Sequence, residues 1–275
     1  MAHIPLEDTF ADIVGKAMRG LQLSETDIAA AAGVTAAAVA SLRDGTFDEV
    51  SARAIAPVLH LGAEALAALG HQAWYPQPVD LPGLVCFTTP YRDMTVNSYL
   101  VFDATSGEAL AVDTGADCRP LLDFLTQSKL TLKHILVTHT HADHVLDLAR
   151  LQQHTGAPAY VGDRESLAGA EGFTAGRHFY CGTLRIATRL TWGHSRGGIT
   201  YVITGLDRLV ALVGDAVFAG SMGGGGVSYI DALRSNREQI LSLPAATVLC
   251  PGHGPLTTVG EQLSHNPFFP KIGII

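Results

Sequence analysis

Apolar and polar positions divide the chain into two parts with different periodicity. Between residues 10 and 69, apolar residues, many of them alanine, recur at the spacing of amphipathic helices. From Gly83 onward, short apolar runs alternate with longer polar segments of helical period, the pattern of buried strands and covering helices. We therefore predict an α+β chain with a small all-α domain at residues 1–75 and a larger domain at residues 83–275.

The N-terminal part contains four predicted helical segments. They are expected at residues 10–20, 27–43, 51–61 and 64–69. The second segment resembles a helix-turn-helix unit of the phage-repressor type. In it Gly33 permits a tight turn, Thr35 caps the following helix, and Val39 and Leu42 face inward.

The charge of this helical part argues against DNA recognition. Residues 1–75 contain four Lys or Arg and nine Asp or Glu, and Arg43 is the single cation on the helix that begins at Thr35. A module that reads a DNA groove needs cations for the phosphates and side chains for the bases. We expect this domain to dimerise or to pack on the larger domain, and we do not expect it to bind nucleic acid.

A proline-rich stretch separates the two parts. Pro76, Pro78 and Pro82 restrict the backbone and break regular structure, so residues 76–82 are predicted to be the linker. Strands are then expected at residues 84–88, 97–102, 109–112, 134–137, 159–161, 184–188, 200–204, 209–213 and 247–250. Helices are expected at residues 117–128, 142–154 and 228–243.

A dense polar cluster follows the predicted strand at residues 134–137. His139, His141, Asp143 and His144 lie within six residues of one another. His139 and His141 are two apart, so they point to the same side of an extended segment, while Asp143 and His144 can face a second point nearby. Imidazole and carboxylate are ligands typical of zinc, iron and manganese. The cluster therefore predicts two neighbouring metal ions.

Three later segments each place one further metal-ligating side chain near a strand end. His194 follows Gly193, Asp215 follows the strand at residues 209–213, and His253 follows the strand at residues 247–250. A single such residue carries little information. Because all these segments emerge from strand ends of one chain, we expect their side chains to meet at one site.

This set of motifs resembles the metallo-β-lactamase superfamily over roughly residues 83–270. The resemblance implies an αββα sandwich with the metal site at its edge. It implies a first ion held by His139, His141 and His194, and a second ion held by Asp143, His144 and His253, with Asp215 bridging them. Asp113, in a segment similar to the Asp-Thr-Gly of the family, is expected to orient a ligand.

Two neighbouring cations would lower the pKa of a bridging water to about neutrality and hold it as hydroxide. We therefore predict a metallohydrolase with two divalent ions per chain, zinc first and iron or manganese as alternatives. Asp143 and Asp215 are the expected catalytic residues among the ligands. The glycine-rich run at residues 220–226, just past Asp215, is expected to border the substrate cleft.

Within the superfamily, the sequence is most similar to the glyoxalase II-like group. The similar segments are residues 97–100, 113–115 and 251–260. This resemblance implies hydrolysis of a thioester, such as an acylglutathione, to an acid and a thiol. The chain stops at Ile275, before the basic helical region of full-length glyoxalase II, and no arginine follows Asp215 where relatives often carry one. The identity of the thiol is therefore left open.

Three other functions stay open. A persulfide dioxygenase of the same fold would use a single iron, and a lactonase would attack a cyclic ester. A DNA-binding regulator that senses a metabolite is disfavoured by the acidic helical domain.

The remaining composition concerns partners and compartment. The formal charge of −8 argues against nonspecific binding to nucleic acid or anionic membranes. No apolar stretch reaches the ~18 residues of a membrane span, and the first ten residues lack the pattern of a secretory signal. The four cysteines are scattered, without a CxxC pair. We expect a cytoplasmic protein with free thiols that acts on a small molecule, with a homodimer as one expected assembly.

Overall fold

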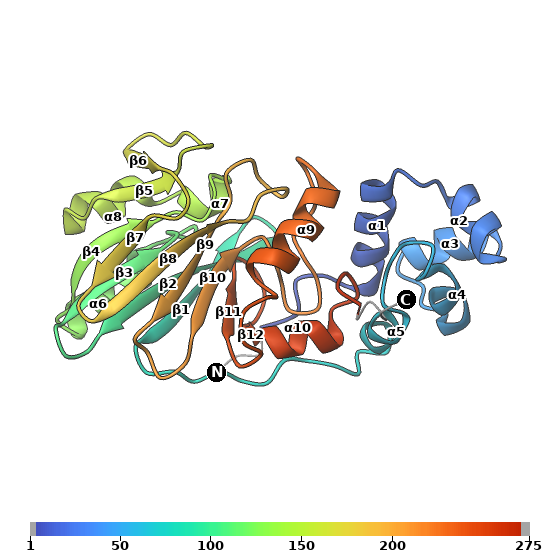
Figure 1. The fold of residues 1–275 in the computed structure, drawn as a ribbon, viewed down its shortest axis with the longest axis horizontal. Helices are drawn as coiled ribbons and strands as arrows, with labels where there is room; N and C mark the ends of the chain where they lie inside the picture. Colours follow the sequence, from blue (N-terminus) through green and yellow to red (C-terminus); the bar gives the residue numbers. More distant parts are fainter. Residues whose placement is uncertain (1–3, 271–275) are drawn as a thin grey trace.

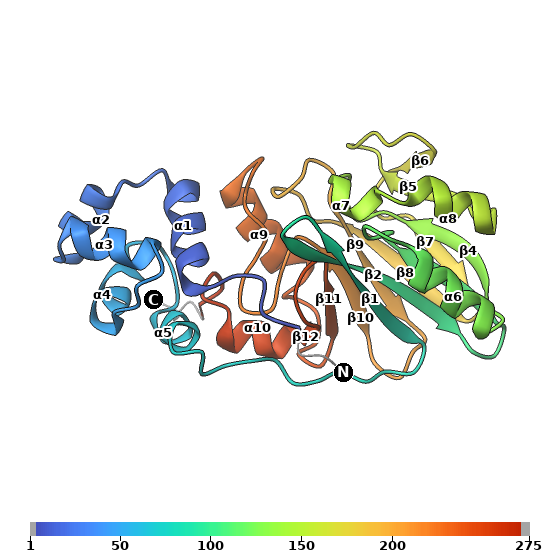
Figure 2. The same ribbon diagram turned by 180° about the vertical axis from the view of Figure 1, so that it is seen from behind.

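The computed structural model describes residues 4–270. Two six-stranded sheets lie face to face, and helices cover their outer sides (Figures 1 and 2). The strand order is β1-β2-β3-β4-β5-β6 in the first sheet and β12-β11-β10-β9-β8-β7 in the second. The predicted α+β class and αββα sandwich are confirmed.

The first sheet is antiparallel from β1 to β3 and parallel from β3 to β6. Its strands are β1 (Leu84–Tyr91), β2 (Met94–Asp103), β3 (Glu108–Val112), β4 (Thr131–Leu136), β5 (Ala159–Gly162) and β6 (Ala170–Phe173). The second sheet is antiparallel except for the parallel pair β10 and β11. Its strands are β7 (His178–Cys181), β8 (Leu184–Leu190), β9 (Ile199–Thr204), β10 (Val210–Gly214), β11 (Val248–Pro251) and β12 (Thr257–Thr258).

Ten helices accompany the sheets within the described residues. The N-terminal ones are α1 (Phe10–Leu21), α2 (Glu25–Ala32), α3 (Ala36–Arg43), α4 (Glu49–Ile55) and α5 (Ala63–Gly70). The others are α6 (Arg119–Gln127), α7 (Ala142–Val145), α8 (Leu148–Thr155), α9 (Tyr229–Gln239) and α10 (Val259–His265).

Alternation along the strands builds the layers of the sandwich. On β3, Leu110 and Val112 enter the core between the sheets, whereas Ala109 and Ala111 face the cluster that contains the apolar sides of α6 and α8. The period of two is that of an extended strand, so neighbouring residues serve opposite faces. Apolar residues on both faces of the central strands explain why their sequence reads as continuous apolar runs.

The N-terminal helices share a core with the outer face of the second sheet. Ile13 of α1, Val213 of β10 and Tyr229 of α9 belong to one buried apolar cluster. Figure 1 shows α1 beside α9 and α5 beside α10. The helical part is thus packed on the larger part through α1 and α5.

The helix-turn-helix-like segment adopts the expected local geometry. Gly33 ends α2 with a φ of 69°, and the Thr35 hydroxyl accepts a hydrogen bond from the backbone N–H of Ala38 at 3.1 Å. Val39 and Leu42 are fully buried, as predicted. Arg43, the cation of α3, forms ion pairs with Glu25 and Asp44.

Several predicted boundaries were wrong. The helix expected at residues 142–154 is broken into α7 and α8, because Asp147 turns toward the loop after β3 and accepts a hydrogen bond from the Cys118 N–H. The helix expected at residues 51–61 ends at Ile55, shortly before Pro57. The strands β6, β7 and β12 and the helix α10 were not predicted.

Membrane-spanning helices and the state of the cysteines can be assessed for the described residues. In residues 4–270, no helix combines the length and apolar character needed to cross a membrane. All four cysteines are free thiols, and three of them are buried.

Candidate metal centre

The seven predicted ligands meet at one edge of the sandwich, where strands of both sheets end. They are delivered by the segment after β4 (His139, His141), by α7 (Asp143, His144), and by the segments after β8 (His194), β10 (Asp215) and β11 (His253). Their ligand atoms form two groups, each within 4.8 Å, of which one contains His139, His141, His194 and Asp215 and the other Asp143, His144 and His253. Residues more than 100 positions apart are therefore assembled by the topology of the sheets.

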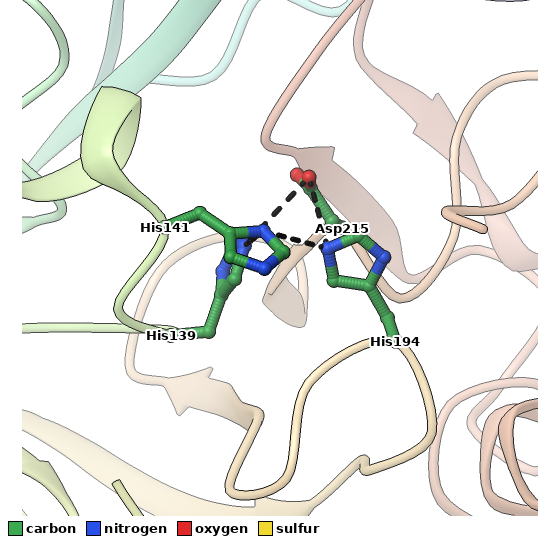
Figure 3. Close-up of side chains that lie close together, drawn as sticks. All are labelled: His139, His141, His194 and Asp215. Carbon is green, nitrogen blue, oxygen red and sulfur yellow. Dashed lines mark hydrogen bonds and ion pairs between the residues drawn. The ribbon is translucent and has the colours of Figure 1, made fainter. Parts of the chain in front are cut away.

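Three imidazoles and one carboxylate form the first cluster (Figure 3). Nδ1 of His141 lies 2.9 Å from Nε2 of His139 and 3.0 Å from Nε2 of His194. Oδ2 of Asp215 lies 3.7 Å from Nε2 of His139 and 3.4 Å from Nε2 of His194. The four side chains point toward one another from three separate segments, as a common cation would require.

The second cluster is buried more deeply beside the first. Oδ2 of Asp143 lies 3.3 Å from Nε2 of His253 and 3.7 Å from Nε2 of His144. Asp215 also reaches this cluster, because its Oδ1 lies 3.3 Å from Nε2 of His144 and its Oδ2 lies 3.5 Å from Nε2 of His253. Asp215 thus brings its carboxylate oxygens within 3.7 Å of imidazoles from both clusters.

The second nitrogen of four imidazoles is held by the surrounding protein. The contacts are His139 Nδ1 to Thr138 Oγ1 at 3.1 Å, His144 Nδ1 to Asp113 Oδ2 at 2.8 Å, His194 Nδ1 to the Gly224 carbonyl at 2.9 Å, and His253 Nδ1 to the Thr95 carbonyl at 2.6 Å. Each contact leaves Nε2 directed into the clusters. Such partners fix the ring orientation of metal-binding histidines.

Asp113 links the strand ends behind the second cluster. The residue is buried and has a φ of 58°, a left-handed conformation that is uncommon for a residue other than glycine. Its carboxylate accepts hydrogen bonds from the N–H and the hydroxyl of Thr138, both at 2.7 Å, and faces His144. The structure therefore places Asp113 where it can orient His144, as the sequence suggested.

The donor atoms of both clusters suit divalent cations. His144 Nε2 and Asp215 Oδ1 are buried, and neither makes a hydrogen bond with the residues that the structure describes. The two atoms face each other at 3.3 Å as an ion pair. Buried polar atoms without a hydrogen bond are costly, and a bound cation would satisfy both. Imidazole nitrogen with carboxylate oxygen is the donor set of zinc, iron and manganese sites. The residues present thus fit a pair of metal ions.

The two clusters differ in charge. Burial lowers the pKa of His139 and of His194, which keeps these imidazoles neutral. Burial also disfavours the charged form of His144, but Asp215 and Asp113 outweigh it and raise the pKa of His144 to about 10. Against the same effect of burial, Asp143 and Asp215 raise the pKa of His253 to about 11. A metal ion binding at the second cluster must therefore displace protons.

Gly252 allows the strand ends to approach one another. A Cβ atom at this position would lie 2.2 Å from Asp215 Oδ1 and 2.5 Å from His144 Cε1. Any larger residue would push two predicted ligands apart. The glycine before His253 is thus a steric requirement of the site.

The segment before α1 also reaches the site, which sequence reasoning missed. The backbone N–H of Glu7 lies 3.2 Å from the position that a Cβ on Gly254 would occupy, next to His253. Burial raises the pKa of Glu7 to about 7, while the positive charge of His253 opposes this rise. No local sequence signal could have shown this contact, because it joins residues almost 250 positions apart.

The chain is similar in sequence to known proteins of one superfamily. The sequence model of the metallo-beta-lactamase superfamily matches residues 91–178. A probable metallo-hydrolase of Streptococcus pyogenes serotype M6 is 30% identical over 200 residues, which are 62% of this chain and 84% of that protein. A hydroxyacylglutathione hydrolase of Neisseria gonorrhoeae is 28% identical over 166 residues, which are 60% of this chain and 65% of that protein.

A solved structure is similar over the same share of the chain. The crystal structure of the BLEG-1 B3 metallo-beta-lactamase is 28% identical, with a TM-score of 0.58, and covers 67% of this chain and 99% of that one. The sandwich fold agrees with this similarity. The chain belongs to the metallo-β-lactamase superfamily.

Proposed function

We propose that this protein is a metal-dependent hydrolase that holds two divalent ions per chain and cleaves a small thioester. His139, His141 and His194 would hold one ion, and Asp143, His144 and His253 the other. The observation that carries the proposal is the position of Asp215, whose two carboxylate oxygens lie within 3.3–3.7 Å of imidazoles from both clusters. A shared carboxylate between two ligand sets is the arrangement of a dinuclear centre.

Bound divalent ions would supply a water of lowered pKa and positive charge that polarises a carbonyl oxygen. The chain provides the rest. His141 is exposed and His194 is partly accessible, whereas the other ligands are buried, so substrate would approach from the side of these two histidines. Asp143, a buried carboxylate of the second cluster, would hold the proton that a water loses on attack.

Three exposed apolar side chains belong to segments that also carry or contact the ligands. Met94, whose neighbour Thr95 holds His253, is 38% exposed, and Leu146, two residues after His144, is 58% exposed. Val227 is 45% exposed, and its N–H donates a hydrogen bond to Gly193, next to His194. We propose that these side chains contact the acyl part of the substrate, because they offer exposed apolar area on segments that hold the ligands.

Two observations favour a thioester over other bonds. The sequence resembles the glyoxalase II-like group, and a relative at 28% identity is named a hydroxyacylglutathione hydrolase. The name of that relative suggests an acylated thiol as the substrate class to test first.

The test is a hydrolysis assay on purified, metal-loaded protein with S-lactoylglutathione, a neutral thioester, a lactone and a β-lactam. We expect thioester turnover that falls on the order of 10³-fold in His139→Ala, because one ligand of the first ion is lost. Oxygen uptake with a persulfide and one iron per chain, without thioester turnover, would replace the proposal with a dioxygenase. Faster turnover of the lactone or the β-lactam would keep the centre and overturn the substrate class.

A further inference from the structure

The strongest unexplained feature is a polar cluster that joins the N-terminal helical part to the edge of the metal centre. It consists of Asp8, just before α1, Lys16 within α1, and Ser221 and Met222 in the glycine-rich loop at residues 220–226. Lys16 and Asp8 form an ion pair, and their side chains are only 15% and 9% exposed. Two charged side chains are rarely buried together unless a specific arrangement compensates for their lost hydration.

Both members of the ion pair bind the loop directly. Nζ of Lys16 donates a hydrogen bond to the Met222 carbonyl at 2.9 Å, and the Ser221 hydroxyl donates one to the Asp8 carboxylate. The ammonium also lies 5.3 Å from the ring centre of Phe218, which makes an edge contact with the His253 ring. The pair therefore fixes the backbone of residues 221–222 from the side of α1.

The next two residues of the loop hold two predicted ligands. The Gly223 N–H donates a hydrogen bond to the Asp215 carbonyl at 3.1 Å, and the Gly224 carbonyl accepts one from His194 Nδ1 at 2.9 Å. A Cβ on Gly223 would lie 2.0 Å from the Asp215 carbonyl oxygen and 2.7 Å from His194 Nδ1. The loop thus packs directly behind the two ligands, and its position sets the direction of His194 Nε2.

We propose that Asp8 and Lys16 are positioning residues of the metal centre, so that the helical part holds the ligand loop in place. The inference rests on the proposed metal ligands His194 and Asp215. It gives the helical part a role in metal binding, which its acidic charge and its helix-turn-helix-like segment do not suggest. Partners that orient metal ligands typically contribute 10- to 100-fold in metal affinity.

A purely structural ion pair would behave differently. Its loss would lower the stability of the fold, but the folded protein would bind metal as before. The decisive variant is the neutral double substitution Asp8→Asn with Lys16→Met. It leaves no unpaired buried charge, and such neutral replacements often keep the stability of the fold.

The experiment titrates metal-free protein with Zn²⁺ against a chromophoric chelator, and with Co²⁺ while recording its d–d absorption bands. We expect Zn²⁺ affinity to fall 10- to 100-fold in the double variant, with changed Co²⁺ bands for the site that contains His194. Lys16→Arg, which keeps the positive charge and hydrogen-bond donors, should lose less affinity than the double variant. The matched control is Arg53→Met, which breaks an exposed ion pair with Glu49 and Glu64 elsewhere in the same helical part.

Equal Zn²⁺ affinity and equal Co²⁺ bands in the unchanged protein and the double variant would overturn the proposal. If the double variant does not fold, Ser221→Ala carries the same comparison, because it removes only the hydroxyl contact with Asp8, and a several-fold loss of affinity is expected. An unchanged protein that binds no Zn²⁺ would instead refute the proposed metal site on which the inference rests.

Discussion

The two ligand clusters share Asp215 but are held in different ways. In the second cluster, the side chains of His144 and His253 are 0% and 3% exposed, and their rings are oriented by the Asp113 carboxylate and by a strand carbonyl. In the first cluster, His141 is exposed, and His194 is 18% exposed and oriented by the glycine-rich loop. The second cluster is buried throughout, whereas the first depends on the glycine-rich loop for the orientation of His194.

The difference suggests a division of work at the site. Buried, charge-paired ligands give a rigid position for an ion, but their imidazoles carry protons that the ion must displace. His139 and His194, which burial keeps neutral, bind an ion without this cost, and the exposed His141 side leaves it open to substrate. The loop that supports them is the one that Lys16 and Asp8 contact.

Removing the shared carboxylate should have the largest effect, because it abolishes the link between the clusters. For Asp215→Ala we expect fewer than two ions per chain and a loss of kcat/KM on the order of 10³-fold or more. Metal analysis and steady-state kinetics check this. The matched control is Asp117→Asn, which alters a carboxylate that pairs with Arg119 and Arg150 away from the ligands. Wild-type metal content in Asp215→Ala would contradict the shared role.

Asp113→Asn should lower metal affinity at one cluster and not at the other, with an effect of intermediate size. The amide can still bind Thr138, but it removes the negative charge that faces His144 Nδ1. We expect metal affinity at the second cluster to fall 10- to 100-fold, with little change at the first. Stepwise Co²⁺ titration followed by absorption measures both. Equal losses of metal affinity at both clusters would contradict a specific role of Asp113 at the second cluster.

The number of protons released on metal binding should differ between the clusters, an effect smaller than the two above. The pKa is about 10 for His144 and about 11 for His253. At pH values below these, the two imidazoles hold protons that a metal ion must displace. Affinity at the second cluster should therefore rise with pH, about tenfold per unit for each proton released. Calorimetry in buffers of different ionisation enthalpy measures this release. The first cluster should release few protons near neutrality, so equal release from both ions would be inconsistent with the charges described.

The sequence predicted that the seven candidate side chains would meet, because they lie near the ends of expected strands and the set resembles the metallo-β-lactamase superfamily. The apolar runs of β3 and before His139 are local signals of buried strands, and strand ends of one sandwich meet at one edge. The fold class follows from the same pattern. The short strands β6 and β7 carry too few apolar residues for such a signal and were missed.

Contacts between distant segments could not be predicted. The break between α7 and α8 depends on Asp147, which bonds to Cys118 in another segment, so helical periodicity alone suggested one continuous helix. Glu7, Asp8 and Lys16 reach the site only because α1 packs on α9 and the second sheet. In the sequence, Asp8 and Lys16 look like ordinary polar residues at and near the start of a helix. Their contacts with the loop at residues 220–226 are visible only in the structure.

The central claim is a dinuclear centre built around Asp215. Native mass spectrometry of the protein after zinc loading and removal of excess metal tests it most directly, because it counts the ions on each intact chain. We predict two ions on the unchanged chain and a smaller number on Asp215→Ala. A single ion on the unchanged chain, under conditions that saturate its binding, would contradict the dinuclear account.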